Sequence, residues 1–147
     1  MDVEKASVIE FIRSLSPIGN GTSIMTGVTN GPKMNLKSQD PRDVVVGLLD
    51  RSVCSVQVAA LLVDNWGIHS WGWNSVGKDG LGWHAEAHCL SRSNRGRLAT
   101  STMYIASRRA RNGKVVTSRP CLKCQPLVKA IGRVIFRDYD GRWVEFP

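Results

Sequence analysis

The sequence contains no apolar run near the roughly 20 residues that a transmembrane helix requires. It also lacks the basic and apolar regions of a secretory signal, because the acidic Asp2 and Glu4 precede only a short amphipathic stretch. There is no internal repeat and no low-complexity tract. These absences predict a soluble, cytoplasmic, globular protein without membrane contact, although a domain cut from a larger secreted chain would look the same.

Cysteine is also scarce, with four residues in 147. A chain of this length can build one hydrophobic core, so it does not need disulfides for stability. Cys121 and Cys124 are closely spaced, which is typical of a metal or redox site. Cys54 and Cys89 lie in apolar, periodic segments and are predicted to be buried structural thiols.

Acidic residues are absent between Ala87 and Arg137, although this stretch holds 12 of the 20 basic residues and the net charge is +8. This asymmetry predicts an electropositive face that attracts phosphate, and a generally basic surface is the alternative. The basic residues of the stretch are Arg92, Arg95, Arg97, Arg108, Arg109, Arg111, Lys114, Arg119, Lys123, Lys129, Arg133 and Arg137.

Hydrophobic periodicity predicts a single domain over 1–147, with an N-terminal helix and long loop at 1–40 and a core at 41–147. The order αα-ββ-α-β-α-ββ indicates an α/β fold with one sheet covered by helices. The expected elements are a helix at 3–15, a loop at 17–39, a helix begun by Asp40-Pro41, strands at 53–63 and 68–74, a helix at 83–93, a strand at 99–106, a basic loop at 108–119, a short helical segment at 120–131 and a hairpin of strands at 134–136 and 143–146.

The strongest chemical signal is the tripeptide His84-Ala85-Glu86 followed by Pro120-Cys121-Leu122-Lys123-Cys124. One imidazole and two thiolates suit Zn²⁺ and leave its fourth tetrahedral position for water. Pro126 does not fit inside a regular helix. Either the segment kinks there, or the cysteines lie on a turn and the regular helix starts at Pro126.

Two other interpretations of these residues remain open. His88 or Cys89 could supply a fourth ligand and close the site as structural zinc. Alternatively, the two cysteines of the C-x-x-C sequence could form a redox dithiol. Neither interpretation explains Glu86.

The pattern H-x-E…P-C-x-x-C resembles the signature of the cytidine deaminase superfamily, and the predicted element order over residues 53–146 is similar as well. The resemblance implies a three-layer domain with a mixed five-stranded sheet and an antiparallel C-terminal hairpin. It implies that His84, Cys121 and Cys124 hold zinc and that Glu86 is the general acid/base.

The same resemblance suggests residues that contact the substrate. Asn74, in Gly72-Trp73-Asn74, looks like the family's sugar ligand, and a plain strand-end turn is the alternative interpretation. Trp83 and Ala85 flank the zinc-ligand histidine and are expected to line the pocket. Four arginines before the cysteines are expected to contact phosphate; these are Arg108, Arg109, Arg111 and Arg119.

The C-terminal hairpin resembles the cytidine deaminase branch, which includes toxin and RNA-editing enzymes, and so favours cytosine over adenine. A histidine ligand in place of the usual cysteine, and no acidic sugar-binding motif after the second strand, argue against a free nucleoside. We expect deamination of cytosine to uracil, preferably in single-stranded DNA or RNA. A free cytidine or deoxycytidine nucleotide is the first alternative substrate. A non-catalytic zinc-containing module that binds nucleic acid is the second alternative.

Overall fold

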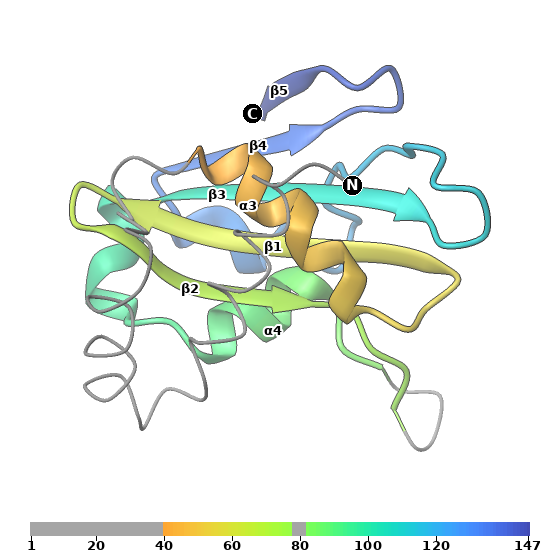
Figure 1. Ribbon diagram of the computed structural model, residues 1–147. Helices are drawn as coiled ribbons and strands as arrows, with labels where there is room; N and C mark the ends of the chain where they lie inside the picture. Colours follow the sequence, from red (N-terminus) through yellow and green to blue (C-terminus); the bar gives the residue numbers. More distant parts are fainter. Residues whose placement is uncertain (1–39, 78–81) are drawn as a thin grey trace, which may run out of the picture.

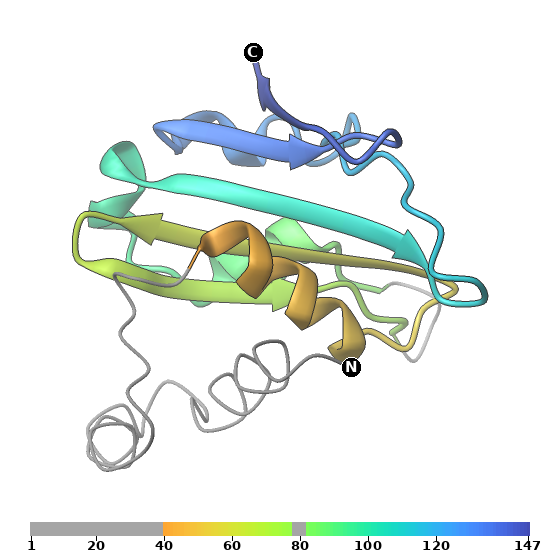
Figure 2. The same cartoon turned by 45° about the horizontal axis from the view of Figure 1, so that its top comes forward.

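A mixed five-stranded sheet forms the centre of the molecule, which a computed structural model describes for residues 40–77 and 82–147 (Figure 1). The strands lie in the order β2-β1-β3-β4-β5, and the β3–β4 pair is parallel while the other three pairs are antiparallel (Figure 2). The bounds are β1 (Val56–Asp64), β2 (Gly67–Trp73), β3 (Thr102–Arg109), β4 (Arg133–Arg137) and β5 (Trp143–Phe146).

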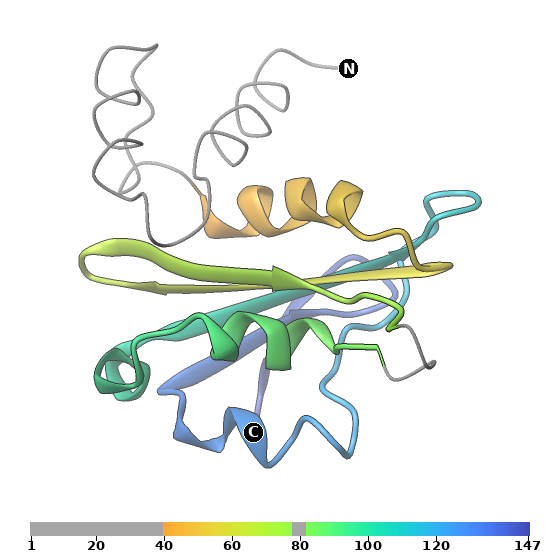
Figure 3. The same cartoon turned by 90° about the horizontal axis from the view of Figure 1, so that it is seen from below.

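Helices cover both faces of this sheet, as seen from below in Figure 3. Helix α3 (Pro41–Leu48) lies on one face, and α4 (Ala85–Ser91) and the 3-10 helix η4 (Leu127–Ala130) lie on the other. Two further 3-10 helices, η2 (Leu49–Arg51) and η3 (Arg95–Thr100), precede β1 and β3. The three-layer architecture predicted from the sequence is therefore confirmed. The predicted helix at 3–15 and loop at 17–39 lie outside the described residues.

Strand β1 is apolar on both sides because each of its faces meets a helix layer. Ala59 and Leu61 belong to the core under α3, whereas Ala60 and Leu62 belong to the core under α4. Helix α3 begins as the sequence predicts, since the Asp40 side chain accepts a hydrogen bond from the Arg42 backbone N–H at 2.9 Å and proline follows the cap. Among the described helices, none combines the length and apolar character needed to cross a bilayer.

Several predicted boundaries need correction. The strand predicted at 99–106 begins at Thr102, because Asn94 caps the 3-10 helix η3 that precedes it. The same strand continues to Arg109, so Arg108 and Arg109 pair with β1 and are not part of the basic loop. The strand predicted at 53–63 spans Val56–Asp64. Cys89 is buried as expected, but Cys54 is only half-buried, in the bend before β1.

The segment at 120–131 is not one helix. Residues 122–126 form turns, and the 3-10 helix η4 follows with Pro126 as its N-cap. The sequence left open whether the segment kinks at Pro126 or carries the cysteines on a turn, and the turn is observed. Strands β4 and β5 form the predicted antiparallel hairpin, with Phe136 opposite Val144.

Candidate active site

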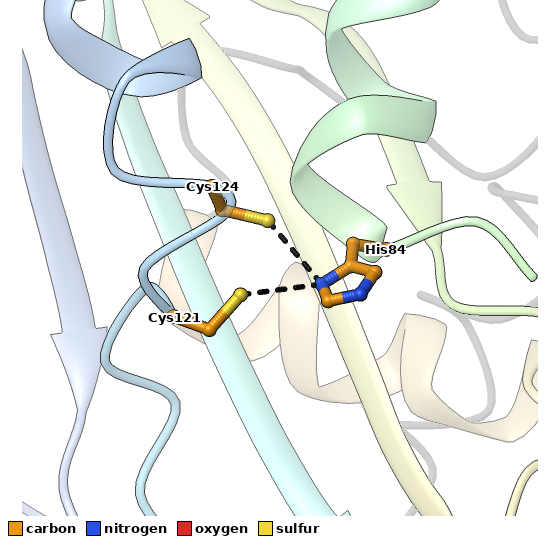
Figure 4. A group of neighbouring side chains, drawn as sticks. All are labelled: His84, Cys121 and Cys124. Atoms are coloured by element: carbon orange, nitrogen blue, oxygen red, sulfur yellow. Dashed lines mark hydrogen bonds between the residues drawn. The ribbon is translucent and has the colours of Figure 1, made fainter.

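Three potential metal ligands converge where the N-terminus of α4 meets the connection between β3 and β4. The ligand atoms of His84, Cys121 and Cys124 lie within 4.8 Å of one another. His84 Nδ1 is 3.5 Å from Cys121 Sγ and 3.3 Å from Cys124 Sγ, and both sulfurs point toward the ring (Figure 4). In a tetrahedral zinc site with bonds of about 2.1 and 2.3 Å, nitrogen and sulfur ligands lie about 3.6 Å apart. The donor set and its spacing therefore fit zinc.

Local backbone structure explains how residues so close in sequence reach one site. His84 is the N-cap of α4 and has extended backbone angles (φ −76°, ψ 150°), whereas Glu86 lies in the first turn of the helix. Two residues inside a helix that are two positions apart point about 200° away from each other. A cap residue does not have helical backbone angles, so this divergence does not apply to His84 and Glu86. Backbone hydrogen bonds from Cys124 N and Gln125 N to Cys121 O, both 2.9 Å, close the turn that carries the sulfurs.

Burial gives this site unusual electrostatics. Glu86 is 5% exposed, and burial raises the pKa of its carboxyl, against smaller opposing effects of its own backbone N–H and of His84. Burial, and next the negative charge of Glu86, also raise the pKa of the Cys124 thiol. A thiolate is therefore costly here unless a cation compensates its charge, as a bound metal ion would.

A cavity of about 410 Å³ opens beside the three ligands, within the usual range of small-molecule sites. Both His84 and the buried Glu86 line it. Three residues that the sequence singled out for substrate contact, Asn74, Trp83 and Ala85, also line it. Its remaining walls come from Val56, Val58, Ser75, Gly82 and Lys123.

Two hydrogen-bonding residues after β2, Asn74 and Ser75, hold the cavity wall in place. The Asn74 carboxamide accepts hydrogen bonds from Ser52 Oγ (2.6 Å) and Val58 N (2.9 Å) and donates one to Val56 O (2.7 Å). It therefore ties three segments together, and its second N–H has no acceptor among the described residues and can serve a ligand. Ser75 N donates to Trp83 O at 3.0 Å, which sets the Trp83–His84 segment beside β2.

Glycine at two positions allows these close approaches. A Cβ on Gly82 would lie 1.8 Å from Ser75 O, and one on Gly72 would lie 2.4 Å from Cys89 N. Only glycine lets the strand and loop backbones come this near to their neighbours. Gly72 thereby sets the distance between β2 and the helix that carries Glu86.

The four arginines predicted to bind phosphate do not line the cavity of the described residues. Arg108 forms an ion pair with Asp50, and its Nε donates to Gln57 at 2.8 Å. Arg119 is exposed, with its guanidinium 5.1 Å from the Phe146 ring centroid. Arg109 and Arg111 are exposed on the strand end and the turn that follows it. Their predicted role in binding phosphate stays a prediction.

Lys123 is a charged cavity residue that the sequence reasoning missed. It lies between the two cysteines, so any turn that brings both sulfurs to one metal also places this lysine nearby. Its position in the motif was the available signal. Because it lines the cavity, it brings a positive charge to the space beside Glu86.

The two residues considered as a fourth ligand are used elsewhere. His88 Nδ1 lies 3.2 Å from Trp73 N and 3.1 Å from Trp73 O. Cys89 is fully buried, and burial raises the pKa of its thiol to about 12. In residues 40–77 and 82–147, the metal-compatible group at this site consists of His84, Cys121 and Cys124 alone. The arrangement thus offers three protein ligands, as catalytic zinc sites do.

Comparisons with solved structures identify the fold. The cytidine deaminase from Burkholderia pseudomallei is similar to 71% of this chain and 87% of its own, with 17% identity and a TM-score of 0.56. The cytidine deaminase from Mycobacterium leprae matches at 20% identity and a TM-score of 0.49, over 71% of this chain and 88% of its own. No protein family and no curated protein matches the sequence. The similarity to the Burkholderia pseudomallei structure shows that the chain has the fold of a cytidine deaminase, as the resemblance predicted.

Proposed function

We propose that this protein hydrolyses the exocyclic amine of cytosine, giving uracil and ammonia, with cytosine in single-stranded nucleic acid as the favoured substrate. One observation carries the proposal: the histidine of a His/Cys/Cys ligand set lines the same cavity as a buried glutamate. We assign the catalytic domain to residues 1–147 as a single unit.

His84, Cys121 and Cys124 would hold zinc, which when bound lowers the pKa of a water ligand to about 7 and supplies hydroxide at neutral pH. Beyond the effect of burial, His84 lowers the pKa of Glu86, and the charge of Glu86 raises the pKa of Cys124. These mutual effects mean that Glu86 lies near the ligands, which supports a role for it beside the metal. A closed structural site would need a fourth protein ligand, and the described residues offer none within the group.

Glu86 provides the proton transfers that the reaction needs. As a carboxylate it takes a proton from the attacking water, and as the acid it delivers that proton to N3 of the ring. The hydroxyl group now bound at C4 then gives up its proton, which Glu86 passes to the amine, so that C4 keeps the oxygen as a carbonyl and ammonia leaves. Burial raises the pKa of Glu86 above its usual value, which makes its carboxylate a better proton acceptor.

The remaining cavity residues fit a nucleotide. Val56 and Val58 give an apolar wall for a planar base, and Asn74 presents an amide N–H near the strand end. Lys123 adds a cation that suits a phosphate, and a phosphate-bearing substrate is also consistent with the acid-free stretch from Ala87 to Arg137. The antiparallel β4–β5 hairpin resembles the cytosine-specific branch and supports cytosine over adenine.

Substrate class can be tested by incubating zinc-loaded protein with cytidine, dCMP, dCTP, single-stranded DNA and RNA, and reading uracil by mass. We expect the fastest turnover on a single-stranded polymer. Glu86→Gln should keep its zinc and lose activity by about 10²- to 10⁴-fold. Faster turnover of a mononucleotide would show that the substrate is a free nucleotide and not a polymer. Deamination of none of these, or of adenine only, would refute the proposal and leave a non-catalytic zinc module.

A further inference from the structure

A cluster of aromatic and cationic side chains extends from the rim of the cavity to the outer edge of β2. Trp83 lines the cavity and is 52% exposed. Its ring centroid is 6.1 Å from that of His88, which is 4.9 Å from that of Trp73. The guanidinium groups of Arg51 and Arg92 lie 5.7 and 5.3 Å from the Trp73 centroid. We call these five residues the edge platform.

The edge platform is held in place before any ligand arrives. His88 is fixed to the backbone of Trp73 through its Nδ1, and its ring meets Trp73 edge to face. Trp83 is anchored through its backbone carbonyl, which accepts from Ser75 N. An aromatic side chain has few rotatable bonds and therefore loses little entropy when a second ring stacks on it.

The chemistry of the edge platform matches a nucleotide. Trp73 is in contact with two guanidinium groups, so the exposed Trp83 ring is the surface open to stacking. Arg92 forms no ion pair with an acidic residue of the described chain, so its charge is available to a phosphate. Base stacking on an aromatic ring combined with a nearby arginine is how proteins bind single strands without reading sequence.

We propose that the edge platform binds the nucleotide that flanks the target cytosine, with Trp83 stacking its base and Arg92 contacting its phosphate. This inference rests on the proposed function and specifies a polynucleotide as its substrate. The cavity holds the reacting base, and the platform begins at the cavity wall, so two consecutive nucleotides would occupy adjoining sites.

Binding can be measured separately from turnover in zinc-loaded Glu86→Gln protein. The probe is a short, fluorescently labelled single-stranded DNA with one central cytosine, and dCMP serves as the unlabelled mononucleotide competitor. We expect Trp83→Ala to weaken binding of the oligonucleotide about tenfold more than binding of dCMP, and Trp83→Phe to restore most of the loss. Arg92→Ala should weaken oligonucleotide binding and reduce its dependence on salt.

Two matched controls separate the platform from general surface effects. Trp66→Ala removes a tryptophan that is 79% exposed at the opposite end of β2, and Arg95→Ala removes an exposed arginine at the start of η3. Neither should change the affinity of either ligand. Equal losses for dCMP and oligonucleotide in Trp83→Ala, or equal losses in the controls, would overturn the inference.

The outcomes also distinguish this inference from the proposed function. If Trp83→Ala loses more affinity for the oligonucleotide than for dCMP but the wild type produces no uracil, the proposed function is wrong and the edge platform is still a nucleotide-binding site. If uracil is produced but Trp83→Ala binds the oligonucleotide like the wild type, the edge platform does not bind the flanking nucleotide and the proposed deaminase function still holds.

Discussion

Replacing Gly72 by alanine should damage the candidate site from a distance. The added Cβ would lie 2.4 Å from Cys89 N, 2.9 Å from the His88 carbonyl carbon and 3.0 Å from Ala85 O. All three atoms belong to the backbone of α4, so no side chain can rotate to relieve the overlap. To restore an ordinary contact of about 3.4 Å, the helix must move away from β2 by about 1 Å.

This shift has two measurable consequences. Overpacking of this kind costs about 1–3 kcal/mol, which corresponds to a Tm lower by roughly 3–10 °C in a domain of this size. Because α4 carries Glu86 and begins at His84, both would move relative to the cysteines. A misplacement of about 1 Å at a reacting centre lowers kcat by about 100-fold.

The assays are thermal unfolding followed by circular dichroism, zinc affinity by chelator competition, and turnover of cytosine. Gly96→Ala is the matched control, because its Cβ would meet only the Asn94 side chain at 3.3 Å. We expect Gly72→Ala to lose stability and activity and Gly96→Ala to keep both. A Gly72→Ala protein with wild-type Tm and kcat would show that the contact between β2 and α4 does not set the geometry of the site.

Three further predictions concern charge and metal. Arg97 lowers the pKa of Asp64 from 3.8 to about 2. The ion pair therefore stabilises the fold at pH values above 3.8, and this contribution is lost as the pH falls from 3.8 toward 2. Urea titrations at pH 7 and pH 2.5 should show that the stability of Arg97→Leu falls less in acid than that of the wild type. Chelation, or Cys124→Ser, should remove zinc and abolish turnover, and added zinc should rescue the chelated wild type but not the variant; full activity without metal would contradict the ligand assignment. Lys123→Ala should raise KM for dCMP about tenfold relative to cytidine, whereas Lys129→Ala, an exposed lysine of η4, should not.

The layer architecture could be predicted because it depends on patterns along single elements. An apolar, β-branched β1 and two hairpins with short turns specify a sheet, and the cap at Asp40-Pro41 specifies the start of α3. Boundaries were less accurate where a 3-10 helix borders a strand. The strand predicted from Ala99 began too early, because Ala99 and Thr100 belong to η3 and periodicity does not show where a short 3-10 helix ends.

Convergence of the candidate ligands could not be worked out from spacing. Residues 84 and 86 would diverge on a helix, and only the extended cap conformation of His84 removes the conflict. The resemblance to zinc deaminases predicted the grouping that this backbone then produces. The cavity residues Val56 and Val58 carried no chemical signal, because an apolar residue that lines a cavity has the same pattern as one that fills a core.

A count of arginines does not show which of them face a site, because it ignores their partners and directions. Arg108 forms an ion pair with Asp50 of η2, a residue 58 positions earlier in the chain. The field of an exposed charge falls off over about 8 Å at physiological salt. A base in the cavity is therefore influenced first by Lys123, which lies in the cavity wall, whereas Arg92 acts at the edge platform beside Trp73. If these two make the main phosphate contacts, the logarithm of the single-strand affinity should fall with the logarithm of salt with a slope of about −1.4, far shallower than the 12 basic residues of the acid-free stretch would suggest.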